Sequence, residues 1–108
     1  MPELKGNERV HFIAPAALYS VESTAPLEEV DLDGQLNEEL RGEVVLTSGR
    51  ILLFREGEVK RFNYSLIEHF LFREGYFIMK RKNVKKKKDI MKVFKNPVEF
   101  EYILRTLL

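Results

Sequence analysis

The alternation of apolar runs with turn residues predicts a chain made mostly of short β-strands. Runs rich in Val, Ile, Leu and Phe are separated by Gly, Pro and charged residues, a pattern typical of strands and tight turns. In the second half, two-residue turns join successive runs, which predicts an antiparallel meander. We expect about seven strands, drawn from the runs at residues 9–14, 18–23, 44–47, 50–54, 58–64, 67–73, 76–82 and 90–94.

The region between the early runs and residue 43 has the weakest pattern. Pro15 is expected to stop the first run, and Pro26 to end the second. Residues 27–42 are acidic and carry turn signals at Asp33-Gly34. A helical turn at Leu36–Arg41 is one interpretation of this region.

The C-terminal residues change from a period of two to a period near 3.6. Asn96 suits a helix N-cap, Pro97 suits the first helical position, and Glu99 completes a capping box. We therefore predict a helix over residues 97–108. Such a short helix is marginal alone and must pack on the sheet and cover its open end. Its apolar stripe consists of Phe100, Ile103, Leu104, Leu107 and Leu108.

Length and composition indicate one domain, residues 1–108, with residues 1–8 as a flexible tail. The absence of Cys excludes disulfides, thiolate metal sites and Cys nucleophiles, and it favours a cytoplasmic location. We expect no signal peptide, because the first residues lack an apolar stretch. A charged share of 32%, with no Cys or Trp and a single Gln, is compatible with a thermophile.

Charge is divided unevenly along the chain. Residues 1–43 hold three basic and ten acidic residues, whereas residues 44–108 hold fifteen basic and seven acidic ones. This polarity indicates either a charged partner or an uneven solvated surface, and both interpretations remain open.

The strongest functional signal is the lysine segment, Lys80 to Lys95, in which Asp89 is the only acidic residue. We expect its consecutive lysines to lie on a hairpin tip and to form a cationic patch for anionic lipid headgroups. The alternative is that lysines protect a sheet edge against aggregation. Nucleic acid is a less favoured partner, because no aromatic residue lies between Lys80 and Lys92 to stack on bases. The candidate ligand-binding residues are Lys80, Arg81, Lys82, Lys85, Lys86, Lys87, Lys88 and Lys92.

Three stretches resemble the pleckstrin-homology (PH) superfamily, most of all its GRAM and bacterial PH-like branches. Residues 42–54 read Gly-Glu-Val-Val-Leu-Thr-Ser-Gly-Arg-Ile-Leu-Leu-Phe, similar to the strand, Leu-Thr turn, Arg and apolar strand of those branches. Residues 62–67 and 94–108 resemble a later strand with its turn and the capping helix. Earlier residues match only in a Glu-containing segment, residues 6–9, before a first strand.

The resemblance implies a mainly β, PH-like fold: a curled antiparallel meander or barrel capped by one C-terminal amphipathic helix. It is nearly silent on function, because the superfamily includes lipid binders, peptide binders and oligomerisation modules. Its usual phosphoinositide loop joins the first two strands. The corresponding residues here, around 15–17, include no Lys or Arg, which counts against specific inositol-phosphate recognition.

The resembling motif also has a purely structural interpretation. Leu46 and Ile51 are expected to face the core across a hairpin. Gly49 is expected to supply the positive φ of a two-residue turn. Arg50 is expected either to lie against the end of the sheet or to reach a carboxylate.

No residue set supports catalysis, a cofactor or a metal. His11 and His69 stand alone, and no nucleophile elbow or glycine-rich phosphate loop is present. The stretch at residues 31–34 resembles part of a calcium loop, but the twelfth place holds Leu40 instead of Glu, so an acidic turn is favoured.

These observations predict a non-catalytic PH/GRAM-like binding or adaptor domain. One hypothesis is association with an anionic membrane surface through the lysine segment, which would make the protein cytoplasmic and peripheral at the membrane. The alternative is a protein–protein or self-assembly module without a lipid ligand, in which an exposed sheet edge binds a partner or the acidic residues meet the lysine segment of a second copy.

Overall fold

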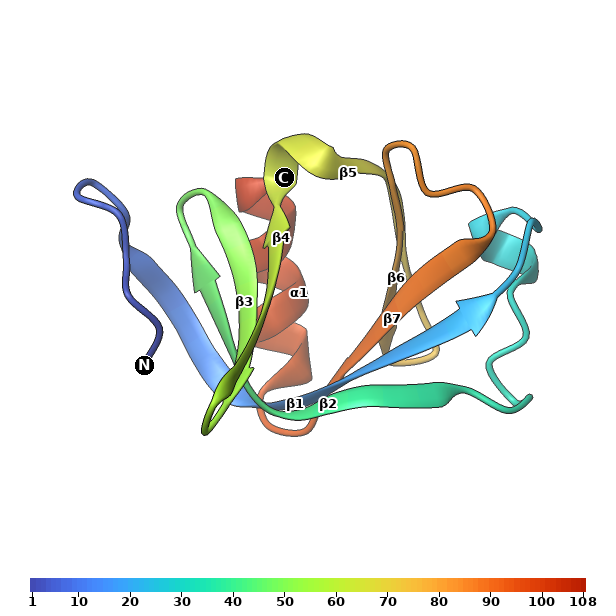
Figure 1. The fold of residues 1–108 in the computed structure, drawn as a ribbon, viewed down its shortest axis with the longest axis horizontal. Helices are drawn as coiled ribbons and strands as arrows, with labels where there is room; N and C mark the ends of the chain where they lie inside the picture. The colour runs from blue at the N-terminus through green and yellow to red at the C-terminus, as the bar shows by residue number, and fades with distance from the viewer.

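In the computed structural model, which describes residues 1–108, seven strands form one antiparallel sheet that curls into a half-barrel (Figure 1). A single helix, α1, follows the last strand. This confirms the expected mainly β fold with one C-terminal helix. The strands are β1 (Val10–Glu22), β2 (Asn37–Thr47), β3 (Arg50–Arg55), β4 (Glu58–Asn63), β5 (Ile67–Arg73), β6 (Tyr76–Arg81) and β7 (Lys87–Val93); α1 is Pro97–Leu107, and two short 3₁₀ turns are η1 (Leu27–Glu29) and η2 (Tyr64–Leu66).

The long first strand organises the sheet, whose order is β4-β3-β2-β1-β7-β6-β5. Strand β1 pairs with β2 on one side and with β7 on the other, so the beginning and the end of the chain meet in the middle of the sheet. Strands β4 and β5 are therefore the two edges, and η2 connects them across the opening of the half-barrel (Figure 1).

The two runs expected on either side of Pro15 form one continuous strand, so the predicted stop at Pro15 is wrong, and residues 15–17 are not the loop between the first two strands, which is residues 23–36. Proline can occupy a strand where its missing N–H is not needed. Here Pro15 pairs with Glu43 of β2, and the β7 ladder begins only at the next residue, Ala16. The Pro15 carbonyl still accepts a hydrogen bond from Phe94 N at 2.9 Å.

The helical turn considered at Leu36–Arg41 is also wrong, because β2 begins at Asn37. The register slips near Glu39, where Leu18 pairs with Leu40 but Tyr19 pairs with Glu38. This bulge adds one residue to β2, and such irregularity hides the alternating pattern of a strand.

The main core fills the concave side of the sheet. Leu46 and Ile51 pair across the β2–β3 hairpin and are fully buried, as expected. From α1, Phe100 and Leu104 are buried in this core, and the rest of the predicted stripe packs against it. Phe100 joins a group of aromatic rings, with its centroid 5.8 Å from that of Phe12. The helix therefore packs on the sheet through its apolar stripe, as predicted.

The start of α1 differs from the predicted capping box. Asn96 has a left-handed backbone (φ 55°, ψ 49°), and its side chain makes no capping hydrogen bond. An N-cap side chain reaches the first free N–H groups from an extended backbone, and the left-handed turn at Asn96 does not provide that geometry. Pro97 does occupy the start of the helix.

A second, smaller core lies on the other face of the sheet and is made by the strap, which we define as residues 23–36 between β1 and β2. Leu27 and Val30 of the strap pack on Ile78 and Ile90. Arg73 fastens it by donating to the carbonyls of Leu27 (3.0 Å), Glu28 (2.5 Å) and Val30. The strap is thus held by a few apolar contacts and one guanidinium.

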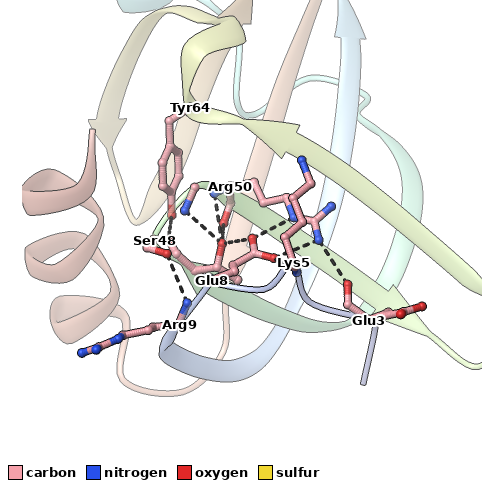
Figure 2. A network of polar contacts seen from close by, with 9 residues as sticks. Glu3, Lys5, Glu8, Arg9, Ser48, Arg50 and Tyr64 are labelled. Carbon is pink, nitrogen blue, oxygen red and sulfur yellow. Dashed lines mark hydrogen bonds and ion pairs between the residues drawn. The ribbon is translucent and has the colours of Figure 1, made fainter.

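The N-terminal residues, expected to be a flexible tail, contact the β2–β3 hairpin through Glu8 (Figure 2). Arg50 Nε donates to Glu8 Oε2 at 2.8 Å, and Thr47 Oγ1 donates to the same oxygen at 2.5 Å. Arg50 therefore reaches a carboxylate, one of its two expected roles. Chiefly through the Arg50 hydrogen bond, the pKa of Glu8 is lowered to about 2.

The β2–β3 turn falls at Ser48-Gly49 as expected, but Gly49 does not have the predicted positive φ; among the glycines only Gly57 and Gly75 do. The turn is held instead by Thr47 Oγ1, which accepts from the N–H of Gly49 (3.2 Å) and Arg50 (3.1 Å). The hydroxyl of Thr47, and not a positive φ at Gly49, therefore stabilises this turn.

Candidate functional site

The predicted lysine segment runs from the end of β6, through the β6–β7 connection, and along β7. Only Lys85 and Lys86 of the four consecutive lysines lie in the connection; Lys87 and Lys88 are the first residues of β7. Successive strand residues point to opposite faces of the sheet. The expectation that all four form one patch on a hairpin tip is therefore wrong.

Three of the eight candidate cations are neutralised within the fold. Lys80 Nζ lies 3.3 Å from Glu68 Oε2. Lys87 Nζ lies 3.2 Å from Glu39 Oε1, whose pKa is lowered first by a hydrogen bond from Ser20 and then by Lys87. These two ion pairs hold their lysines against the protein.

The third neutralised cation is Arg81, whose Nε lies 2.7 Å from Asp89 Oδ2. The Asp89 residue is 1% exposed, whereas the Arg81 side chain is 31% exposed, so a buried carboxylate is paired with a partly exposed guanidinium. The guanidinium of Arg81 also lies over the ring of Phe62 on β4, 5.5 Å from its centroid. Arg81 thus links β7 to the opposite edge of the half-barrel, which is a structural role.

Three lysines near the β6–β7 connection, Lys82, Lys85 and Lys86, are exposed and form no ion pair. The N–H of Lys82 donates to the carbonyl of Leu66 in η2 at 2.9 Å, so this connection and η2 lie side by side at one end of the half-barrel (Figure 1). Leu66 itself is 50% exposed. Free positive charge and an exposed apolar side chain therefore share this end.

Beside this end, the first strap residues, β5, β6, the β6–β7 connection and β7 line a cleft of about 600 Å³. We call it the strap cleft. Three of the candidate lysines, Lys80, Lys85 and Lys88, lie on its wall. Its other lining residues are Thr24, Ala25, Pro26, Leu27, Glu28, Glu68, His69 and Phe70.

Lys88 is the unusual member of this set because it is only 3% exposed. Its Nζ donates to the carbonyl of Ser23 at 2.7 Å, and no carboxylate lies within ion-pair distance. An ammonium group carries three donors, and burial of a charge is costly unless a counter-charge or several hydrogen bonds compensate for it. The structure provides one carbonyl for this purpose.

The last candidate, Lys92, lies apart from the others. It is four residues beyond Lys88 on β7, with its Nζ 5.0 Å from the ring centroid of Tyr76. It does not line the strap cleft. The structure thus brings Lys80, Lys85 and Lys88 together, places Lys82 and Lys86 beside them in the connection, and separates Lys92.

Within the acidic residues 27–42, the acidic turn expected at residues 31–34 is present, whereas residues 37–42 belong to β2. Asp31 Oδ1 accepts hydrogen bonds from the N–H groups of Asp33 and Gly34, both at 3.0 Å. No group of three or more His, Cys, Asp or Glu side chains is placed to hold a metal ion. Elsewhere in this region, Glu39 pairs with Lys87 and Glu28 lines the strap cleft, whereas Glu38 pairs with Arg41.

Several residues of this site carry no signal in the sequence. The pattern of residues 67–73 predicts only a strand for Glu68, His69 and Phe70, although His69 Nε2 lies 3.4 Å from Glu68 Oε1 on the cleft wall. Strap residues 24–28 reach the site only because Leu27 and Val30 fold onto the sheet. The apolar residues within this acidic stretch, Leu27 and Val30 among them, are the local signal that it packs on the sheet.

No protein-family model matches this chain, and no curated protein is similar enough to be counted as a relative. The curled seven-stranded sheet and the C-terminal helix are compatible with a PH-like fold. None of the helices has the length and apolar character needed to cross a bilayer.

Proposed function

We propose that this chain is a non-catalytic, PH/GRAM-like binding or adaptor domain that docks on anionic lipid headgroups. The single observation that supports this most is the group of free lysines, Lys82, Lys85 and Lys86, at one end of the half-barrel beside exposed Leu66. Peripheral membrane association commonly combines basic residues with a shallowly inserted apolar side chain.

The expected strength of this contact is modest. Each basic residue near an anionic bilayer contributes about 1 kcal/mol, so three free lysines contribute about 3 kcal/mol, or roughly a hundredfold in affinity. Full burial of a Leu side chain adds about 1.5–3 kcal/mol, and half-buried Leu66 adds a part of that. The domain therefore binds reversibly, and firm attachment requires a second copy or a second membrane contact.

The alternative function is a protein-binding or self-assembly module, which specific observations also favour. Strands β4 and β5 are unpaired edges of the sheet, and such edges can accept a further strand. On the outer surface of α1, Val98 and Tyr102 are 82% and 72% exposed. A partner on α1 would leave the lysines of the β6–β7 connection free.

A comparison of two anionic ligands separates these functions. We expect the wild-type protein to co-sediment with phosphatidylserine-containing vesicles and not with neutral vesicles. The variant Leu66→Ser should bind those vesicles several-fold more weakly but bind soluble heparin as the wild type does, because heparin offers charge without an apolar phase. No binding to acidic vesicles at low salt would reject the membrane proposal and favour the protein-binding alternative.

A further inference from the structure

We propose that the strap cleft is a discrete binding site for one phosphate-type group, with Lys88 as its anchor. The inference rests on the proposed function for its class of ligand, and it adds a specific pocket to a surface that otherwise acts by diffuse charge. The exposed lysines, Lys82 and Lys86, do not line the cleft. These two lysines attract an anionic surface without selecting a particular group. The strap cleft binds one phosphate group selectively.

The buried ammonium of Lys88 carries the argument. It is 3% exposed, lines a cleft of about 600 Å³ and has one hydrogen-bond acceptor, the Ser23 carbonyl at 2.7 Å. A positive charge in this position is incompletely compensated by the protein. An anion in the cleft supplies the missing counter-charge and accepts the remaining N–H bonds, which are strong because both partners are charged.

The other walls define the chemistry of the ligand. Lys85 is exposed at the entrance and free of ion pairs, so it can close over a bound anion. Thr24 contributes a hydroxyl that makes no hydrogen bond in the protein, and Leu27 and Phe70 also line the cleft.

The acidic residues of the cleft set an upper limit on ligand charge. Glu68 is held by Lys80 at 3.3 Å, and Glu28 faces solvent from the strap. Counting Lys80, Lys85 and Lys88 against these two carboxylates leaves a net charge of +1 with His69 neutral. This balance fits one phosphate group and disfavours a polyphosphate, whose further charges would meet Glu28.

A phosphate group can belong to a lipid headgroup or be free in solution, so the test uses both sources. The amide resonances of the intact protein are followed by NMR during titration with inorganic phosphate, against chloride at matched ionic strength. We expect saturable shifts at Thr24, Lys85 and Lys88 with phosphate and none with chloride. Vesicles containing phosphatidic acid should displace the phosphate if the lipid is the source, and leave it bound if free phosphate is.

Two adjacent lysines form a matched pair of variants. Lys85→Gln removes a cleft charge and should weaken phosphate binding about fivefold, the effect of about 1 kcal/mol; Lys86→Gln removes the same charge one residue outside the cleft and should change it less than twofold. Lys88→Met should abolish saturable phosphate binding. If this variant does not fold, the comparison of Lys85→Gln with Lys86→Gln still tests the cleft site.

Equal weakening of phosphate binding by Lys85→Gln and Lys86→Gln, or chemical shifts that do not saturate, would overturn the cleft site. Vesicle binding that persists without saturable phosphate binding would reject the cleft alone, whereas saturable phosphate binding without vesicle binding would reject membrane docking alone.

Discussion

The guanidinium of Arg50 and the carboxylate of Glu8 form a buried ion pair, with 2.8 Å between Nε and Oε2, although 42 residues separate them in the chain. This pair joins the N-terminal residues to the β2–β3 hairpin. Arg50 Nη2 also donates to Glu8 Oε1 at 3.0 Å, so the contact is bidentate. Such geometry makes the pair stronger than an ordinary surface salt bridge.

Stability should therefore depend on the ionisation of Glu8. Its pKa is lowered from the ordinary value of 4.5 to about 2, first by the hydrogen bond from Arg50. A group with a lowered folded pKa stabilises the protein above its unfolded pKa, and this contribution disappears as the pH falls toward the folded pKa. We expect Glu8→Gln to lose about 2–3 kcal/mol of unfolding free energy at neutral pH. Urea denaturation between pH 7 and pH about 2 measures the difference in unfolding free energy between the wild type and Glu8→Gln. This difference should become smaller below pH about 4.5.

Glu3→Gln is the matched control for this experiment, because only the backbone carbonyl of Glu3 contacts Arg50. It should follow the wild type at every pH. A constant difference between Glu8→Gln and the wild type down to pH about 2 would contradict the proposed role of the Glu8 carboxylate.

Arg73 should control the strap. Its guanidinium donates to three strap carbonyls, and its removal leaves those of Glu28 and Val30 without a donor. We expect Arg73→Ala to accelerate hydrogen exchange of Val30 N–H, which donates to Leu27 O, while β3 amides keep their protection. Arg55→Ala removes an exposed arginine without an ion pair and should leave exchange in the strap unchanged. Equal protection of the strap in Arg73→Ala and the wild type would show that the apolar contacts hold it alone.

The helix should contribute through one face only. Leu104 is fully buried against the sheet, so Leu104→Ala should reduce the unfolding free energy by about 2–5 kcal/mol. Tyr102 is exposed on the opposite face, and Tyr102→Ala should change the unfolding free energy by less than about 0.5 kcal/mol. Chemical denaturation of both variants tests this, and similar midpoints would show that α1 does not pack as described.

Lys88 and Lys86 should differ in stability as well as in binding. Lys88 is buried and bonded to Ser23 O, whereas the Lys86 side chain is in solvent. Lys88→Ala leaves a cavity and a carbonyl without its partner, and because it also removes an incompletely compensated buried charge, its net cost should be about 1 kcal/mol. Lys86→Ala should cost less than about 0.5 kcal/mol. Thermal unfolding measures both, and equal melting temperatures would contradict the burial of Lys88.

The sequence predicted best those elements that are defined by local signals. Glu56-Gly57 and Glu74-Gly75 each join two strands as expected, because a two-residue turn fixes the register on both sides. Strand β5 matches its expected bounds, and α1 begins at Pro97 as predicted. These signals do not depend on distant residues.

The errors concern features that depend on contacts far along the chain. The strap packs on Ile78 and Ile90, which follow it by about fifty and about sixty residues, so its acidic pattern alone predicts only a turn. The sequence marked Lys80 to Lys95 as basic, but it contained no sign that Glu39 and Glu68 neutralise two of its lysines. Ion-pair partners and burial are tertiary properties, and a count of charges does not contain them.

The most direct test of membrane docking compares two triple variants with the same change of charge. One variant replaces Lys82, Lys85 and Lys86 by Gln; the other replaces Lys5, Lys60 and Lys95, which are exposed elsewhere and form no ion pair. Co-sedimentation with phosphatidylserine vesicles is measured at salt concentrations of about 0.1 M and about 1 M, where the Debye length is about 10 Å and about 3 Å.

We predict that the first triple variant loses binding by roughly a hundredfold at the lower salt concentration, that the second keeps most of it, and that high salt removes binding of the wild type. Equal binding of the two triple variants to acidic vesicles would contradict docking through the β6–β7 connection.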